Sequence, residues 1–511
     1  MKLTRNIIPN IVMATAGAVL LSSCNKYLDE MPSKTTSVVV SNTGQLDLLL
    51  NGYTNFYTEG NRTAIYGTDD YEVTPTLFNA RPATFGITPF IFSLWDIEYL
   101  PDDTREGFWS GEWRKIFNAN LVLSQISKVT GSDQDKARLK AEAHFIRAYS
   151  YFQLANTYCL PYTEANKAEM GLPIKVSTSF EESTARATLE ETYALIDADL
   201  EEALKIQTPL IQEGKQRHWR ANIAAVNGFA ARYYLVRNNY EKALTHANAA
   251  LAEHGRLVDY RTEMSYGNSF NYTINAGTPS SQLVTVKFPY THNNQTNLTD
   301  MLEWKEFMYF RMLNHESWWY VPSQELLDLY DQANDLRYEY HIVEGYSYDR
   351  GIINPSFDYP GYVFFFKDRI PSGPTTAEML LIKAECQART TDPAGAMTTI
   401  NQLREKRMKP GAHVNLTAAN KDEAIKKVLE ERRREMPFVH RWMDVRRYNN
   451  NADPNDDVIL TKTFYSYNNA AVDANSALKT YTLPKDSRRF AVPLPRTELV
   501  SSMGVIKQNT Y

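Results

Sequence analysis

Apolar residues recur at helical spacing along several long stretches of the chain. They do so over Gln45 to Phe56, over about 105–128 and 134–158, and again over 188–206. The last stretch opens with Thr188 and carries Glu191 three residues later, which is the pattern of a capping box at a helix start. These stretches predict a series of long amphipathic helices.

A pair of helices near 221–252 carries small residues along one stripe. Such a stripe lets two helices approach closely, as in a tetratricopeptide hairpin. The same pattern returns about 153 residues later, near 376–408, and a further helix pair covers about 420–433 and 438–448. The matching residues are Ala231, Ala243, Leu244 and Asn248 in the first hairpin and Ala384, Ala396, Met397 and Asn401 in the second.

The region between the two hairpins, about 256–375, breaks the helical rhythm. It contains Gly, Pro, Asn and paired aromatic residues, with short β-like runs at Gln282 to Phe288 and Tyr362 to Lys367. Long irregular insertions are uncommon unless they carry function. Residues 60–104 and the last sixty residues are interpreted as loops and irregular structure.

The predicted fold is therefore mainly α. One domain, 43–511, combines a tetratricopeptide-like helical-hairpin scaffold (about 105–255 and 376–448) with the loop-rich insertion at about 256–375 and few short strands. Trp442, between Arg441, Asp444 and Arg446, is expected in the core, with these charges as a structural network.

The N-terminal residues predict the cellular location of the protein. Lys2 and Arg5 precede an apolar run from Ile7 to Leu21, which is short for a membrane span, and small residues lead directly to Cys24. This arrangement resembles a bacterial lipoprotein signal, with residues 1–23 removed, Cys24 lipidated and 24–42 serving as a tether. An ordinary secretory signal with an unrelated cysteine is the alternative.

Charge and chemistry exclude several classes of protein. The formal net charge of −5 gives no positive field for a nucleic-acid partner. After lipidation only Cys159 and Cys386 remain, so a disulfide framework and a cysteine zinc site are excluded. The nine histidines form no HExxH motif, and the sequence has no G-x-S-x-G elbow, phosphate loop or calcium loop. We expect a non-enzyme without a cofactor and assign no metal ligand, although the sequence leaves open both bound calcium and a pair of glycosidase carboxylates.

Six segments resemble motifs of the SusD/RagB family of nutrient-binding outer-membrane lipoproteins of the Bacteroidetes. The likeness spans most of the chain, and its most specific part is the AEAHFIRAYSYFQLANTY segment. The segments are Cys24 to Pro32, Trp113 to Asn120, Ala141 to Tyr158, Leu380 to Leu403, Glu431 to Tyr448 and Gln508 to Tyr511.

The resemblance implies a function at the cell surface. Family members sit over a SusC-like TonB-dependent outer-membrane transporter and hold an oligosaccharide at the interface. The chain is therefore expected to be a lipid-anchored glycan-binding protein that faces the cell surface and delivers oligosaccharide to such a transporter. A peptide-binding member of the family, a surface glycoside hydrolase and a repeat scaffold that binds only protein remain as alternatives.

Two groups of residues fit a glycan site, because sugars stack on aromatic rings and hydrogen-bond to forked polar side chains. Trp95 could instead be a buried anchor for its loop and contact no ligand. Either Asp70 or Arg81 could instead belong to a structural ion pair. The first group is Asp70, Arg81, Trp95, Asp96 and Tyr99; the second is Trp304, Trp318 and Trp319.

Overall fold

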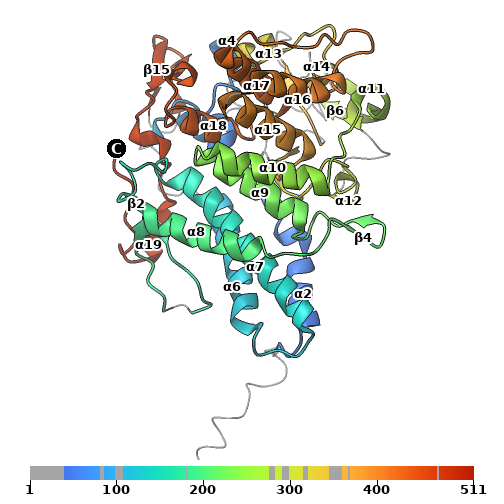
Figure 1. Ribbon diagram of the computed structural model, residues 1–511. Coiled ribbons are helices and arrows are strands. Elements are labelled where there is room, and N and C mark those ends of the chain that lie inside the picture. The colour runs from blue at the N-terminus through green and yellow to red at the C-terminus, as the bar shows by residue number, and fades with distance from the viewer. Residues whose placement is uncertain are drawn as a thin grey trace, which may run out of the picture.

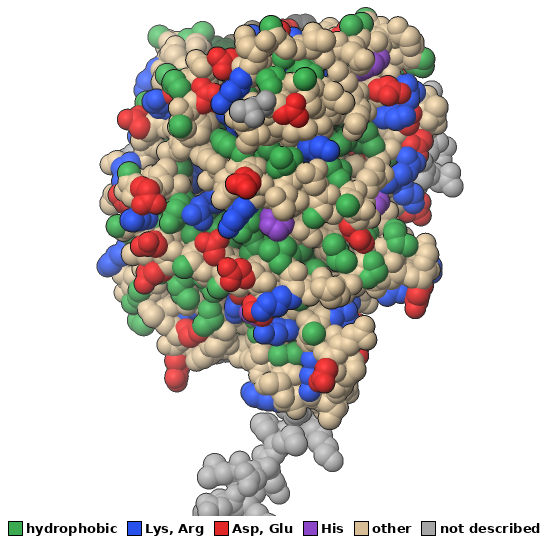
Figure 2. Space-filling model, in the orientation of Figure 1, with side chains coloured by type: hydrophobic (Ala, Val, Ile, Leu, Met, Phe, Trp, Pro, Cys, Tyr) green, Lys and Arg blue, Asp and Glu red, His purple; other side chains and the backbone are tan. Residues whose placement is uncertain are grey.

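The structure is a computed structural model of a mainly helical protein (Figure 1). Among the described residues, no helix has the length and apolar character needed to cross a bilayer. On the face shown in Figure 2, basic side chains lie interspersed with acidic ones. The described ranges are 40–80, 86–97, 107–179, 181–274, 282–290, 298–314, 320–343, 360–365, 369–390, 392–468 and 471–511.

The first helical unit is formed by α6 (Gly107–Gln125), α7 (Asp133–Tyr158) and α8 (Leu189–Ala203), which pack in sequence order. The Ser132 side chain accepts from the amide of Asp135 and caps α7. At α8 the Thr188 side chain and Glu191 form the predicted capping box. Close to these helices, α2 (Thr43–Asn51) packs on α6 and α7.

The two predicted hairpins lie directly against each other, although about 120 residues separate them in the sequence. Helix α9 (Ile223–Val236) pairs with α10 (Tyr240–Glu253), α15 (Thr376–Thr390) pairs with α16 (Pro393–Glu405), and α10 packs on α15. The stacked hairpins occupy the middle and upper part of Figure 1. The prediction of a helical-hairpin scaffold is confirmed.

The small residues of the repeated pattern explain this close packing. Ala231, Ala243, Ala384 and Ala396 have no exposed surface. A larger side chain at any of these positions would separate the helix axes. The stack is completed by α17 (Lys421–Glu435), which packs on α15 and α16, and by α18 (Arg441–Tyr448).

Residues 60–104 differ from the prediction, because short helices replace the expected loops in their described part. Asn61 caps the first of these helices, and the apolar residues of all three contact the core. Four-residue apolar runs carry too little periodicity for a helix to be recognised from sequence. The helices are α3 (Arg62–Tyr66), α4 (Pro75–Ala80) and α5 (Ile87–Ser93).

The insertion contains short helices and strands. Its longest strands, β6 (Ser265–Ile274) and β7 (Gln282–Tyr290), pair in antiparallel fashion, and β7 contains the predicted run from Gln282 to Phe288. A three-stranded sheet joins β8 (Met312–Asn314) to β1 (Thr58–Glu59) and β11 (Arg369–Pro371). The other elements are α11 (Tyr260–Glu263), α12 (Leu298–Met301), α13 (Gln324–Asp328), α14 (Leu336–His341), β9 (Ile342–Val343) and β10 (Gly361–Tyr362).

The C-terminal region packs against the N-terminal part of the domain. Strands β12 (Leu460–Phe464) and β15 (Lys479–Leu483) form an antiparallel pair against the short N-terminal helices. The remaining short elements are β2 (Met170–Pro173), β3 (Arg186–Thr188), β4 (Ile211–Gln212), β5 (Lys215–Gln216), β13 (Tyr467–Asn468), β14 (Ala471–Val472), α19 (Arg496–Ser501) and the 3₁₀ turns at Tyr53–Asn55, Pro454–Asp456 and Arg488–Phe490.

An ion pair with almost no solvent contact joins the two hairpins. Arg232 on α9 donates to both carboxylate oxygens of Glu378 on α15, at 2.7 and 2.6 Å. The same guanidinium donates to the Tyr149 hydroxyl and to the carbonyl oxygen of Ser372. Every charged oxygen of the pair thus has a partner, which a buried charge requires.

Replacing Arg232 by Met should lower the free energy of unfolding by about 3–5 kcal/mol, because Glu378 would remain as an uncompensated buried charge. The double variant Arg232→Met/Glu378→Leu should recover much of that loss. Urea denaturation followed by circular dichroism measures both. The exposed pair Glu213–Arg217 is the control, and Glu213→Gln should cost less than about 1 kcal/mol. Equal losses in Arg232→Met and Glu213→Gln would contradict the assignment.

Candidate ligand-binding site

Trp95 lies in the interior, at the corner where α5 ends. Its side chain is 2% exposed, and its indole nitrogen donates to the carbonyl oxygen of Gly67 at 2.8 Å. Its backbone has a positive φ of 56°, a conformation that non-glycine residues rarely adopt. A ring without an exposed face cannot stack on a sugar, so the alternative reading, a buried anchor for the loop, describes Trp95 in this structure.

Asp70 is a structural carboxylate. It has no exposed surface, accepts from Arg433 at 2.6 Å and accepts from the amide of Phe438 at 2.8 Å. Neighbouring Asp69 accepts two hydrogen bonds from Arg441. Although burial opposes ionisation, Arg441 holds the pKa of Asp69 well below its usual range. Both carboxylates therefore fix α17 and α18 to the N-terminal segment, and Asp70 presents no free oxygen to a ligand.

Trp304 is also buried, in a separate part of the molecule from Trp95. It is 2% exposed and packs edge-on against Phe364, Phe365 and Tyr260, with ring centroids 5.0–6.4 Å apart. The expectation that Trp304 offers a flat surface to a glycan is therefore corrected: an indole of this size gains more from burial in the insertion's aromatic core.

Asp96 is the described member of the first group that keeps solvent contact. It follows Trp95 directly and is half-buried. The pKa of Tyr481 on β15 is raised mainly by the burial of Tyr481 and further by the negative charge of Asp96. Arg81, Tyr99, Trp318 and Trp319 lie outside the described residues, as does Cys24.

Tyr481, whose pKa Asp96 influences, donates its hydroxyl to the carbonyl oxygen of Tyr465. The structure brings Tyr465 together with an asparagine, which sequence reasoning did not do. The exposed Asn79 on α4 donates to the hydroxyl of the half-exposed Tyr465 at 2.8 Å. Tyr465 directly follows β12, and its ring packs on Phe464 and Phe78. A partly exposed ring, held in place by an amide, has the combination of apolar face and polar edge that suits sugars.

We call Asn79, Asp96 and Tyr465 the rim. It lies next in sequence to residues 81–85 and 98–106, which contain Arg81 and Tyr99. The alternation of aromatic and polar residues in Phe464-Tyr465-Ser466-Tyr467 is the only sequence signal that marks Tyr465. The contact with Asn79 bridges 386 positions and is not readable from sequence.

Lys462 on β12 connects the elements that carry the rim residues. Its ammonium donates to the carbonyl oxygens of Tyr66 and Tyr71 and to the hydroxyl of Ser93. It also lies 5.8 Å from the centroid of the Trp95 ring. Burial lowers the pKa of Lys462 to about 8. One cation thus joins the C-terminal hairpin to α3, to α5 and to the loop between α3 and α4.

The rim brings together polar and aromatic groups. Among the residues that the structure describes, no group of three or more His, Cys, Asp or Glu side chains could hold a metal ion. The rim offers a ring face, an amide and a carboxylate, which hydrogen-bond to hydroxyl groups and stack on C–H faces.

Comparison with known proteins identifies the family. A family model described as starch-binding and associating with the outer membrane matches residues 26–235, and the model of the SusD family matches residues 376–511. The chain belongs to the SusD family.

Individual relatives are distant. A SusD-like protein from Formosa agariphila is 24% identical over 392 residues, which cover 67% of this chain and 72% of the relative. A putative sugar binding protein from Bacteroides vulgatus shares the fold with a TM-score of 0.62 and 18% identity, over 93% of this chain and 99% of that one. A laminarin binding SusD-like protein has a TM-score of 0.55 and 16% identity, over 92% and 99% of the two chains.

The lowered pKa of Lys462 predicts a pH-dependent stability. Between about pH 8 and pH 10.5 the unfolded chain binds the proton that the folded chain has lost, so folding becomes more favourable as pH rises. The difference in unfolding free energy between the wild type and Lys462→Met should therefore grow by up to about 1.4 kcal/mol per pH unit in this window. Urea denaturation of both proteins at pH 8 and pH 10 measures it. A pH-independent difference would show that Lys462 titrates normally.

Proposed function

We propose that this protein is a cell-surface, lipid-anchored receptor that holds an oligosaccharide and passes it to a SusC-like TonB-dependent transporter in the outer membrane. The observation that carries the glycan part is the rim, a partly exposed tyrosine oriented by an exposed asparagine, to which the half-buried Asp96 is linked through Tyr481. Membership of the SusD family and a shared fold with sugar- and laminarin-binding proteins support it.

The proposed mechanism is capture without a chemical step. The Tyr465 ring faces the C–H surface of a sugar, while Asn79 and Asp96 accept hydrogen bonds from its hydroxyl groups. Arg81, Tyr99, Trp318 and Trp319 are proposed to complete the site. Because a surface site leaves much of the sugar solvated, we expect dissociation constants of about micromolar to millimolar.

The proposed anchor fits the position where the described chain begins. The amide of Thr43 donates to the carbonyl oxygen of Thr130, and this contact fixes the start of α2 to the turn between α6 and α7. About sixteen residues separate Cys24 from Val40, and a chain of this length reaches at most roughly 55 Å. The end of the molecule with the α6–α7 turn is therefore proposed to lie nearest the membrane.

Replacing Tyr465 by Ala should weaken oligosaccharide binding about fivefold to tenfold, because a stacking surface worth about 1 kcal/mol is lost. Asn79→Ala, which frees the Tyr465 hydroxyl, should have a smaller effect in the same direction. Isothermal titration calorimetry against glycans and peptides in parallel measures both variants. The partly exposed Phe117 on α6 is a matched control, and Phe117→Ala should bind as the wild type does. Unchanged glycan isotherms for Tyr465→Ala, or binding of peptides alone, would refute the glycan site.

Trp318→Ala and Trp319→Ala test the other half of the proposed site. At least one of the two should weaken glycan binding by tenfold or more while the thermal unfolding midpoint stays within about 2 °C, because an indole that contacts ligand contributes little to the fold. Loss of stability without loss of affinity would assign the pair to the core.

Replacing Cys24 by Ala should release the protein from the membrane fraction, because several acyl chains on one residue provide the membrane affinity. Fractionation with an antibody against the domain measures the distribution. Retention of Cys24→Ala in washed membranes would contradict a lipid anchor at this cysteine.

A further inference from the structure

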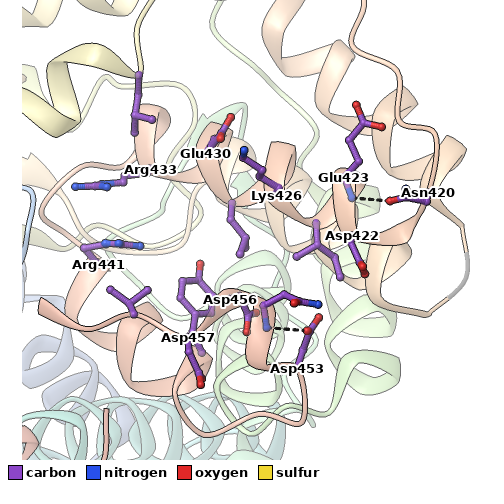
Figure 3. Close-up of a pocket in the computed structure, with 16 residues that line it drawn as sticks. Asn420, Asp422, Glu423, Lys426, Glu430, Arg433, Arg441, Asp453, Asp456 and Asp457 are labelled. Carbon is purple, nitrogen blue, oxygen red and sulfur yellow. Dashed lines mark hydrogen bonds between the residues drawn. The ribbon is translucent and has the colours of Figure 1, made fainter. Parts of the chain in front are cut away.

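A groove with a volume of about 600 Å³ lies between α17 and the segment 453–458, and no residue of the rim lines it (Figure 3). Helix α17 forms one wall with Asp422, Lys426 and Glu430, and the segment forms the opposite wall with Asp453 and Asp457. A volume of this size is within the range of small-molecule sites, about 300–1,000 Å³.

Apolar side chains form the floor of this groove. Leu329, Leu429 and Val458 are half-buried, while Ile425 and Tyr448 are almost completely buried. The Tyr448 side chain is 2% exposed, and its hydroxyl accepts a hydrogen bond from Arg447. Among the described residues that hydroxyl donates to no acceptor, so one donor of a buried side chain that lines the groove remains available.

The two arginines at the closed end are neutralised by carboxylates outside the groove. Arg433 pairs with Asp70 and Glu325, and Arg441 pairs with Asp69. The charge of neither guanidinium is therefore available to balance the acidic side chains along the walls.

Several of those acidic side chains have no close cation. Asp422 and Glu430 form no ion pair with a described residue, and Asp453 lies 4.0 Å from a nitrogen of Arg389. Arg389 itself pairs with Glu385 and Asp456. Asp457 and Glu423 pair with Lys485 and Lys427, which do not line the groove. Asp422 and Glu430 therefore remain against Lys426, the one unpaired base among the lining residues, and this balance is negative.

The groove also continues beyond its open end. A second hollow of about 300 Å³ shares Asp422 and Asp453 with the first. The half-exposed Tyr240 lies in its lining. Its lining also contains Lys421 and Arg389, so the carboxylates over an apolar floor belong to the first groove.

We propose that this groove binds a linear aliphatic polyamine, independently of the glycan site. Ammonium groups spaced along a methylene chain match carboxylates spaced along apolar walls, since each charge meets a carboxylate while each methylene covers Leu429, Val458 or Ile425. The Tyr448 hydroxyl donates to a bound water at the floor, and that water accepts a hydrogen bond from an ammonium group. A neutral sugar would leave Asp422, Asp453 and Glu430 without compensation.

Calorimetric titration of the full-length lipoprotein in detergent with spermidine tests the proposal. We expect saturable binding at one site, with an affinity that falls as salt rises. In a series from 1,3-diaminopropane to 1,8-diaminooctane, affinity should increase by up to about fourfold per added methylene, because the floor is apolar. Tyr465→Ala should leave these isotherms unchanged, which separates this proposal from that of the glycan site.

The variant Asp422→Asn/Asp453→Asn should weaken spermidine binding at least tenfold. The matched control Asp133→Asn/Glu201→Gln removes two exposed acidic charges elsewhere and should bind as the wild type does. Equal weakening in both double variants would assign binding to net charge and overturn the proposal. An isotherm indistinguishable from buffer, or an affinity independent of chain length, would also overturn it.

Discussion

Buried arginine–carboxylate pairs between elements that are far apart in sequence hold this fold together. Arg232 with Glu378 joins α9 to α15, Arg447 with Glu385 joins α18 to α15, and Arg311 lies between Glu59 and Glu112. In each case the side chains are almost free of solvent contact. Such pairs add little net stability over an apolar substitute, but a register error would leave a charge unpaired at a cost of several kcal/mol. The pairs therefore favour one arrangement of similar helical hairpins over others.

The same constraint shapes the ligand surface. The N-terminal short helices contact the C-terminal pair β12–β15 through Lys462, whose ammonium reaches three acceptors. Asp69 and Asp70, which follow α3, bind arginines of α17 and α18. This charged base holds Trp95 in place and brings Tyr465 beside Asn79. It also explains why the two arginines that line the groove do not neutralise it, because Arg433 and Arg441 pair with carboxylates that lie outside its lining.

Much of the fold was predictable, since long helices leave a periodic pattern. The capping box at Thr188, the alanine stripes of the two hairpins and the core position of Trp442 follow from spacing, and the structure confirms them. The short helices of 60–104 were missed, because a helix of five to seven residues has too few apolar positions to show a period. The site was less predictable. A tryptophan near polar residues in a loop fits both a ligand platform and a loop anchor, and Trp95 and Trp304 are buried.

The sequence by itself determined the helical class, the hairpin repeat and the membership of a family, because these depend on local periodicity and on short motifs. Tertiary structure decided which aromatic rings are exposed, which charges are paired and where grooves form. Those properties depend on contacts such as Asn79 with Tyr465 or Asp70 with Arg433, which join residues more than 350 positions apart. No spacing along the chain encodes such a contact, because it arises only when separate helices pack around a shared core.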